Sequence, residues 1–195
     1  MKLEGRTVPT PEKTSLSAIV AAGRDILESG GQDGLTMQSV ANRVGVRAPS
    51  LYKHVRDRAA LLAAVAEAAI DDLITRLEAT DGSLEELAHG YRRFAHDRPQ
   101  GFRLIFSAIA PPEALDRAAE PILRAARQLA GDKDALEAAR LVTAWATGFI
   151  EMELAGAFRL GGDVDHAFAY GLARMRRALA DDTPPAPRRS ARARR

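Results

Sequence analysis

A short polar stretch between residues 47 and 58 carries the side chains best suited to binding a polyanion. Its hydroxyl, imidazole and cationic groups belong to Arg47, Ser50, Tyr52, Lys53, His54 and Arg58. From Arg43 to Arg58 there are five Arg or Lys residues against one acid, Asp57. Such groups hold phosphate oxygens when a fold presents them together, whereas an isolated charge run is more often a solvated surface. The elements that carry these side chains therefore decide between the two interpretations.

The pattern around this stretch predicts two short helices joined by a tight turn. Thr36 is a suitable N-cap, and apolar residues then repeat at helical spacing, at Met37, Val40, Ala41 and Val44. Gly45 can adopt the left-handed conformation that ends a helix, and Pro49 fits the first turn of the next one. Leu51 and Val55 then point inward, and Asp57 can cap the following helix. This is a helix-turn-helix, a motif whose second helix enters the major groove of DNA.

The segment resembles the DNA-binding domain of TetR-type transcriptional repressors. The likeness covers residues 12–72 and rests on the helix 15–30 followed by Leu35-Thr36, Val40-Ala41, Val44-Gly45-Val46, Leu51-Tyr52, His54-Val55 and Leu61-Leu62. It implies that Tyr52, His54 and Arg58 hold phosphates. It also implies that the base-facing residues are Gln38, Arg47, Ala48 and Pro49. Ser50 and Lys53 join the set because they point outward.

The residues that face the bases are predicted to recognise the DNA sequence only weakly. Arg47 is able to read a guanine through two hydrogen bonds, whereas Ala48 and Pro49 offer only apolar contact with a thymine methyl. A motif of this size reads DNA weakly, so two copies on a dimer are expected.

Apolar residues follow the helical period along the rest of the chain, which predicts an all-α fold of about nine helices. We expect a three-helix helix-turn-helix domain over residues 12–72 and a helical ligand-binding and dimerisation domain over 73–180. Among the later helices, one is expected over 113–129, ended by Gly131, and a long one over 134–158. The Pro- and Arg-rich tail 181–195 is expected to be disordered.

The segment Gly148–Phe158 is similar to part of the WHG-type C-terminal domain of the same family, although Thr147 stands where that pattern has His and Trp145 is offset. The resemblance implies a small-molecule site, and ligand sites commonly lie between the helices of bundles. The predicted pocket consists of Phe94, Phe102, Phe106, Trp145, Phe149 and Glu153. The alternative is that the rings fill a core and that the carboxylate faces solvent.

Small and apolar residues on the last two helices predict the dimer interface, as an intermolecular four-helix bundle. The residues expected there are Ala144, Gly148, Leu172 and Met175.

Composition excludes several classes of protein. Cysteine is absent, which rules out disulfides and thiolate metal sites. No apolar run approaches the length that spans a bilayer, and the N-terminus lacks a secretory h-region, so a cytoplasmic protein without membrane contact is expected. The four histidines lack zinc-site spacing and no catalytic constellation is visible. We therefore predict no metal, no cofactor and no enzymatic activity.

Together these features predict a homodimeric, ligand-responsive transcriptional regulator. It is expected to act as a repressor that a small apolar or aromatic effector releases from a palindromic double-stranded operator. The main alternative is a helical adaptor or scaffold without DNA binding, and a helical enzyme is a weaker one.

Overall fold

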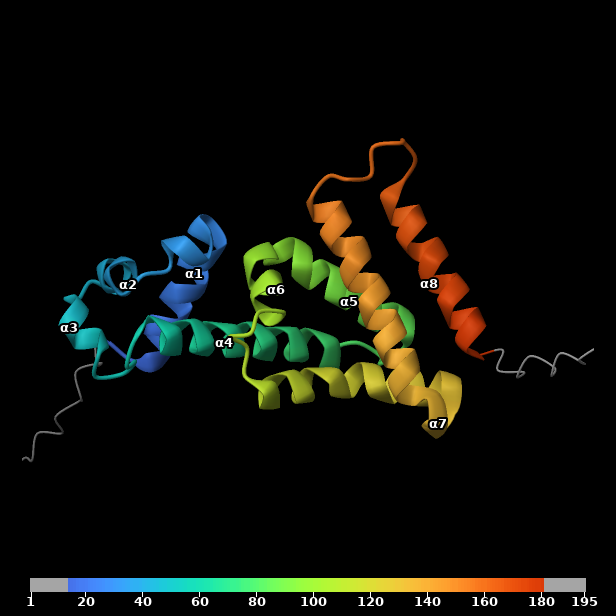
Figure 1. Cartoon of the computed structure of the whole chain (residues 1–195), viewed down its shortest axis with the longest axis horizontal. Helices are drawn as coiled ribbons and strands as arrows, with labels where there is room; N and C mark the ends of the chain where they lie inside the picture. Colours follow the sequence, from blue (N-terminus) through green and yellow to red (C-terminus); the bar gives the residue numbers. More distant parts are fainter. Residues whose placement is uncertain (1–13, 181–195) are drawn as a thin grey trace, which may run out of the picture. The chain divides into compact units, whose positions relative to one another are not determined.

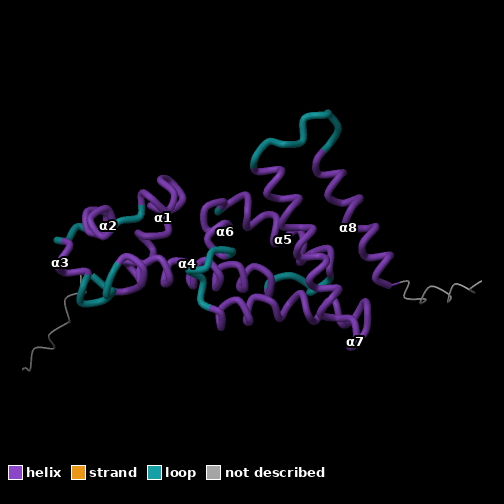
Figure 2. The backbone as a smooth tube through the Cα atoms, in the orientation of Figure 1, coloured by secondary structure: helices purple, strands orange, loops and turns teal. Residues whose placement is uncertain are grey.

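The computed structural model describes residues 14–180, and this part of the chain is helical with no strand (Figures 1 and 2). The helices are α1 Leu16–Gly34, α2 Met37–Val44, α3 Ala48–Leu51, α4 Arg58–Glu78, α5 Leu84–Asp97, α6 Pro99–Ile105, α7 Pro112–Leu154 and α8 Val164–Ala180. The all-α prediction is confirmed. The tail 181–195, for which we expected disorder, lies outside the described residues.

The sequence predicted nine helices and residues 14–180 contain eight, and the difference lies in α7. Gly131 has φ 76° and ψ 169°, so the helical conformation is interrupted there, where the sequence predicted the end of one helix. The second part of α7 ends at Leu154, four residues before the predicted Phe158. The reason is Gly156, whose φ of 64° reverses the chain early. The Ala157 N–H then donates to the Met152 carbonyl at 2.8 Å, which closes the helix end.

The chain divides into two compact units. Within the described residues, the first contains 14–80 and 90–120, and the second contains 81–89 and 121–180. The described part of the first unit therefore holds α1 to α4, most of α5, α6 and the start of α7. This division differs from the expected boundary between residues 72 and 73, because α6 groups with the helices of the helix-turn-helix.

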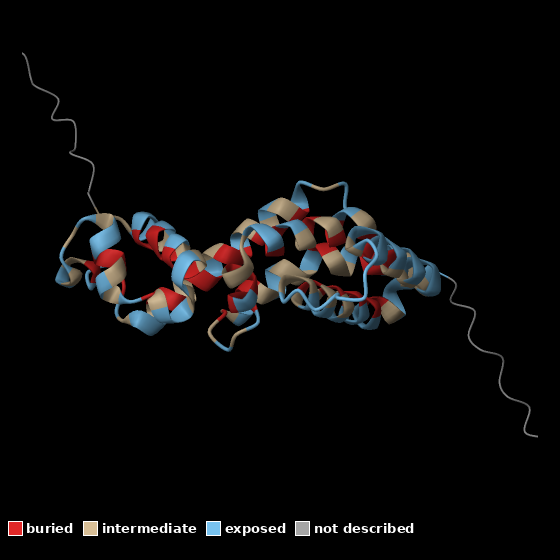
Figure 3. Ribbon diagram, turned by 90° about the horizontal axis from the view of Figure 1, so that it is seen from above, coloured by how far each residue is buried: buried red, intermediate tan, exposed pale blue. Residues whose placement is uncertain are grey.

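The first unit is built around α1, which packs against α2, α4 and α6, while α4 also packs against α6. The inner sides of these helices are buried (Figure 3), with Ile19, Leu61 and Phe102 fully covered. At Gly23 an added Cβ would lie 2.7 Å from the Val65 Cγ2. The close approach of α1 to α4 therefore requires glycine at this position.

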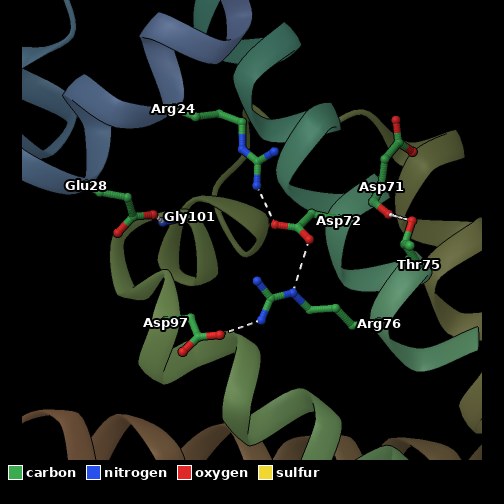
Figure 4. Close-up of polar contacts among 8 residues, drawn as sticks. All are labelled: Arg24, Glu28, Asp71, Asp72, Thr75, Arg76, Asp97 and Gly101. Carbon is green, nitrogen blue, oxygen red and sulfur yellow. Dashed lines mark hydrogen bonds and ion pairs between the residues drawn. The ribbon is translucent and has the colours of Figure 1, made fainter. Parts of the chain in front are cut away.

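A chain of ion pairs joins α1, α4 and α5 within the first unit (Figure 4). The Arg24 guanidinium binds the Asp72 carboxylate, whose other oxygen accepts from the Arg76 Nε at 3.1 Å. Arg76 also contacts Asp97, with 2.6 Å between nitrogen and oxygen. Burial opposes ionisation of Asp72, but the hydrogen bonds from Arg76 and Arg24 outweigh it and lower the pKa of this carboxyl.

A second polar contact links α1 to the start of α6. The Glu28 carboxylate accepts hydrogen bonds from the backbone N–H groups of Gln100, at 3.1 Å, and Gly101, at 2.8 Å. The first N–H groups of a helix have no partner inside that helix, and a negative charge there is favourable. Glu28 therefore caps α6 from a helix that lies more than seventy residues away in the sequence.

The second unit contains the close contact of α7 with α8. The Trp145 ring lies over Gly171, where an added Cβ would be 2.5 Å from the ring atom Cζ2. Further along these helices, Ala126, Ala138 and Ala139 form a small buried cluster that Ile122 and Leu179 cover in part. None of the helices in the described part of the chain is both long enough and apolar enough to cross a bilayer.

Candidate nucleic-acid interface

The entry into the helix-turn-helix is fixed by local capping. The Thr36 hydroxyl accepts the Ser39 N–H at 3.0 Å, and the Ser39 hydroxyl accepts the Thr36 N–H at the same distance. The reciprocal pair is a capping box, with serine in the place where glutamate or glutamine is more usual. The predicted Thr36 cap is confirmed.

The turn between α2 and α3 depends on Gly45, which has φ 79°. Its N–H donates to the Ala41 carbonyl at 3.0 Å, and the next N–H, that of Val46, reaches the same carbonyl at 2.9 Å. The left-handed conformation lets both amides close the last turn of α2. The predicted helix end at Gly45 is confirmed.

The second helix of the motif is short. α3 covers only Ala48–Leu51, with Pro49 in its first turn as predicted. The N–H groups of His54 and Val55 both donate to the Leu51 carbonyl at 2.9 Å, so the chain stays coiled for a few residues beyond it. Leu51 and Val55 are buried, as the sequence predicted.

Burial of these two apolar residues leaves the polar side chains of the motif facing outward. Arg47, Tyr52, Lys53 and His54 are exposed, and 55% of Tyr52 is accessible. Pro49 is also exposed, while Ala48 and Ser50 are half-buried. The structure thus gathers most of the predicted phosphate-binding and base-facing groups around one short helix.

Gln38, the remaining predicted base-facing residue, lies exposed on α2. Its Nε2 donates to the Asn42 Oδ1 at 2.8 Å, an i, i+4 pair that orients the amide. Asn42 is absent from the predicted site, although the spacing of two amides four residues apart was a visible signal.

The start of α4 adds a charged corner to the motif. The Asp57 carboxylate accepts the Ala60 N–H at 2.8 Å, which confirms the predicted cap, and it also pairs with Arg56 at 2.9 Å. The Ala60 hydrogen bond, followed by the Arg56 side chain, lowers the pKa of Asp57.

Arg58 has structural partners that the sequence did not reveal. Its Nε donates to the Leu35 carbonyl at 2.8 Å, and a terminal nitrogen donates to the Gln32 carbonyl. Two of its five N–H donors are therefore directed at backbone oxygens. The phosphate contact that the family resemblance implies for Arg58 stays a prediction.

The predicted pocket residues divide between the two compact units. In the first unit, Phe94 and Phe102 are fully buried and Phe106 is 53% exposed. The Phe102 ring meets the rings of Phe106 and Tyr91 edge-on, with centroids 5.4 and 5.3 Å apart. The Arg76 guanidinium lies 5.5 Å from the centre of the Phe94 ring.

In the second unit, Trp145 and Phe149 belong to a larger group of rings. Trp145 stacks on Phe168 at 5.1 Å between centroids, and Phe149 contacts Phe168 at 5.2 Å and Phe158 at 4.7 Å. His89 meets Phe168 edge-on at 5.5 Å. Phe168, which was not among the predicted pocket residues, lies at the centre of this ring cluster and is fully buried. Glu153 is half-buried on the same helix as Trp145.

One residue of the predicted dimer interface is placed differently by the structure. Leu172 is only 1% exposed in the single chain, because α8 turns Phe168 and Leu172 together into its own unit. It therefore has no surface to offer a second copy. Ala144 and Gly148 are exposed on α7, and Met175 is half-buried on α8.

The exposed side of α7 carries a continuous apolar stripe. Leu141, Ala144, Gly148 and Met152 follow one another at spacings of three and four residues, and Leu141 and Met152 are 53% and 49% exposed. Leu141 and Met152 are the large apolar side chains of this surface, and Met152 was not predicted to belong to it.

Comparison with known proteins matches both halves of the chain. Residues 19–65 match the family model described as bacterial regulatory proteins, tetR family. Residues 84–175 match a model described as tetracyclin repressor-like, C-terminal domain. The finer likeness to a WHG-type domain stays a prediction.

Individual relatives agree with these matches. An uncharacterized HTH-type transcriptional regulator of Mycobacterium tuberculosis is 36% identical over 100 residues, which are 48% of this chain and 46% of that protein. The class A tetracycline repressor protein from transposon 1721 of Escherichia coli is 45% identical over 56 residues, 29% of this chain and 26% of that protein. The chain thus spans less than half the length of these curated relatives.

Solved structures match over most of the chain. A TetR variant from Acinetobacter baumannii, solved in complex with minocycline, aligns with a TM-score of 0.64 and 27% identity, covering 85% of this chain and 96% of that one. Mycobacterium smegmatis BioQ aligns with a TM-score of 0.65 and 26% identity, covering 86% and 98%. With its two halves matched by models of one family and its fold matched by members of that family, this chain belongs to the TetR family of bacterial transcriptional regulators.

Proposed function

We propose that this protein is a homodimeric, ligand-responsive transcriptional regulator that acts as a repressor at a palindromic operator. The observation that carries the proposal is the row of exposed polar side chains, Arg47, Tyr52, Lys53 and His54, on a helix-turn-helix whose apolar side is buried. Cationic and hydroxyl groups presented in this way contact phosphates, while Arg47 is able to reach a base edge. In this role the chain catalyses no reaction, needs no cofactor and works in the cytoplasm.

A salt titration tests the DNA-binding part of the proposal. The protein is expected to bind duplex DNA with an affinity that falls steeply as salt rises. Lys53→Ala should weaken binding to all sequences about equally and reduce the slope of log affinity against log salt by about one. Lys133→Ala is the matched control, since Lys133 is an exposed lysine on α7, and it should leave the slope unchanged. Failure of the unaltered protein to bind DNA would favour the helical adaptor instead.

The proposed effector is a small apolar or aromatic molecule that binds among the aromatic residues. The ring cluster of the second unit supports this, because Trp145 and Phe149 are only partly covered there. The chain has a single tryptophan, so an effector that reaches Trp145 should change its fluorescence. Phe149→Ala should weaken that change and the release of DNA together, while DNA affinity without effector stays the same. An effector that releases DNA without any dependence on Phe149 or Trp145 would place the pocket elsewhere.

The proposed dimer uses the exposed stripe of α7 together with the neighbouring surface of α8. Leu141 and Met152 replace Leu172 as the principal apolar contacts. Only side chains that are exposed in the single chain can bury further apolar surface when a dimer forms, and this burial stabilises the dimer. Ala144 and Gly148 lie between them and allow two helices to approach closely.

A further inference from the structure

Arg58 links the two ends of the segment that contains the helix-turn-helix. It is the first residue of α4, directly after the end of the motif, yet its guanidinium binds the carbonyl oxygens of Gln32 and Leu35 at the end of α1. These contacts join residues 26 and 23 positions apart in the sequence. The two ends of the segment 35–57, which contains α2 and α3, are therefore held together by one side chain.

The chemistry of this contact favours arginine. α1 is interrupted at Gly31, which has φ 64° and ψ −171°, so Gln32 and Leu35 lie in the short turn that follows, where the Leu35 N–H donates to the Gln32 carbonyl at 3.3 Å. A cationic side chain adds a charge-assisted hydrogen bond to each of the two carbonyls. The guanidinium presents several donors in a fixed fork, so it can bind two carbonyls at once, whereas an ammonium is a single point of charge. Leu35, one of the two acceptors, is itself fully buried, so the corner that Arg58 holds is anchored in the core.

The segment that this contact closes has little regular structure of its own. α3 is a single turn, and beyond it the chain is held by the burial of Leu51 and Val55 and by the hydrogen bonds to the Leu51 carbonyl. The direction in which the motif presents Arg47 and Tyr52 thus depends on how the ends of the segment are fixed.

We propose that Arg58, although exposed, is a positioning residue, which holds the DNA-reading segment in place through the carbonyls of Gln32 and Leu35. This inference rests on the proposed function and deepens it. A phosphate ligand acts through its charge, and a lysine can replace that charge. A clamp on two carbonyls acts through its forked geometry, which a lysine lacks.

The test compares Arg58→Lys with Arg56→Lys, the same substitution at an arginine two residues earlier whose side chain is 84% exposed. The first measurement is amide hydrogen exchange of residues 35–57 in the full-length protein without DNA. Arg58→Lys is expected to speed exchange in this segment by about tenfold, the factor that corresponds to one charge-assisted hydrogen bond. Arg56→Lys is expected to leave it unchanged. Because no DNA is present, this measurement stands even if the proposed function is wrong.

The second measurement is affinity for two duplexes, one selected by the unaltered protein from a random-sequence library and one of random sequence, over a range of salt concentrations. Arg58→Lys should lower the ratio of selected to random affinity by about tenfold without changing the salt slope. Unchanged exchange together with an unchanged ratio would overturn the proposal. So would a salt slope that falls by about one in Arg58→Ala while Arg58→Lys behaves like the unaltered protein, since Arg58 would then act only through its charge.

Discussion

The contact between Trp145 and Gly171 permits a quantitative test of how α7 and α8 pack. In Gly171→Ala the new Cβ would lie 2.5 Å from the Trp145 Cζ2 and 3.2 Å from its Cε2, closer than carbon atoms pack. The ring has little freedom to move away, because Phe168 stacks on it and Phe149 lies beside it. Overpacking of this kind costs about 1–3 kcal/mol. The higher helix propensity of alanine opposes this cost by about 1 kcal/mol.

Gly148→Ala on α7 isolates the packing contribution when both variants are made in the Met152→Glu background, in which the proposed dimer interface that contains Gly148 is disrupted. An added Cβ at Gly148 meets nothing within 4 Å, so this variant should show only the helix-propensity gain of about 1 kcal/mol. The difference in unfolding free energy between the two variants is then about 1–3 kcal/mol, in favour of Gly148→Ala. For a chain of this length, each kcal/mol corresponds to a shift in melting temperature of roughly 2–4 °C.

Denaturation followed by the emission of Trp145, the single tryptophan, measures this difference in the unit that holds both glycines. Sedimentation should show that both variants are monomeric in this background, so that the comparison measures packing within one chain. Equal stability of Gly171→Ala and Gly148→Ala would refute the reasoning, because the indole would then have room to move.

Three further outcomes are expected. Arg47→Ala should relax the sequence preference at one base pair of each half-site, with a loss of roughly 1–3 kcal/mol of binding free energy there. Binding to a panel of operators with single-base changes measures this loss. A uniform loss over all positions would make Arg47 a phosphate ligand. Asp72→Asn should destabilise the protein by about 1 kcal/mol at neutral pH, as expected for a partly exposed carboxylate that pairs with Arg24 and Arg76. Because the pKa of Asp72 is lowered on folding, its contribution is present above the ordinary carboxyl value of 3.8 and disappears as the pH falls below it, so the two proteins should converge in acid-denaturation curves. Met152→Glu should place a charge in the proposed dimer interface and yield monomers in sedimentation, whereas an intact dimer would move the interface away from this stripe.

The features that the sequence predicted correctly depend on neighbours within a few residues. The Thr36 cap, the left-handed Gly45 and the Asp57 cap all form with partners no more than four residues away. Side-chain type and spacing are sufficient for such contacts. The helical period likewise separates the buried Leu51 and Val55 from the polar residues around them.

The features that escaped prediction depend on contacts between distant segments. No local pattern shows that Arg58 reaches the end of α1, or that Glu28 caps α6. The period of α8 identifies Leu172 as part of an apolar face, but it does not show whether the same chain or a second copy covers that face. Phe168 was missed for the same reason, since its ring partners come from α5 and α7.

The grouping of α6 with α1 and α4 bears on how such proteins can be recombined. The family model for the DNA-binding part ends at residue 65, which suggests a convenient joint for a gene fusion. A cut there, or after Thr80, would uncover the sides of α1 and α4 against which α6 packs and would leave Glu28, on α1, without the amides that it caps. A fragment of that kind would expose apolar surface and tend to aggregate. A working chimaera would have to carry residues 90–120 along with α1 to α4, so that the transplanted DNA-binding helices keep α6 packed against them.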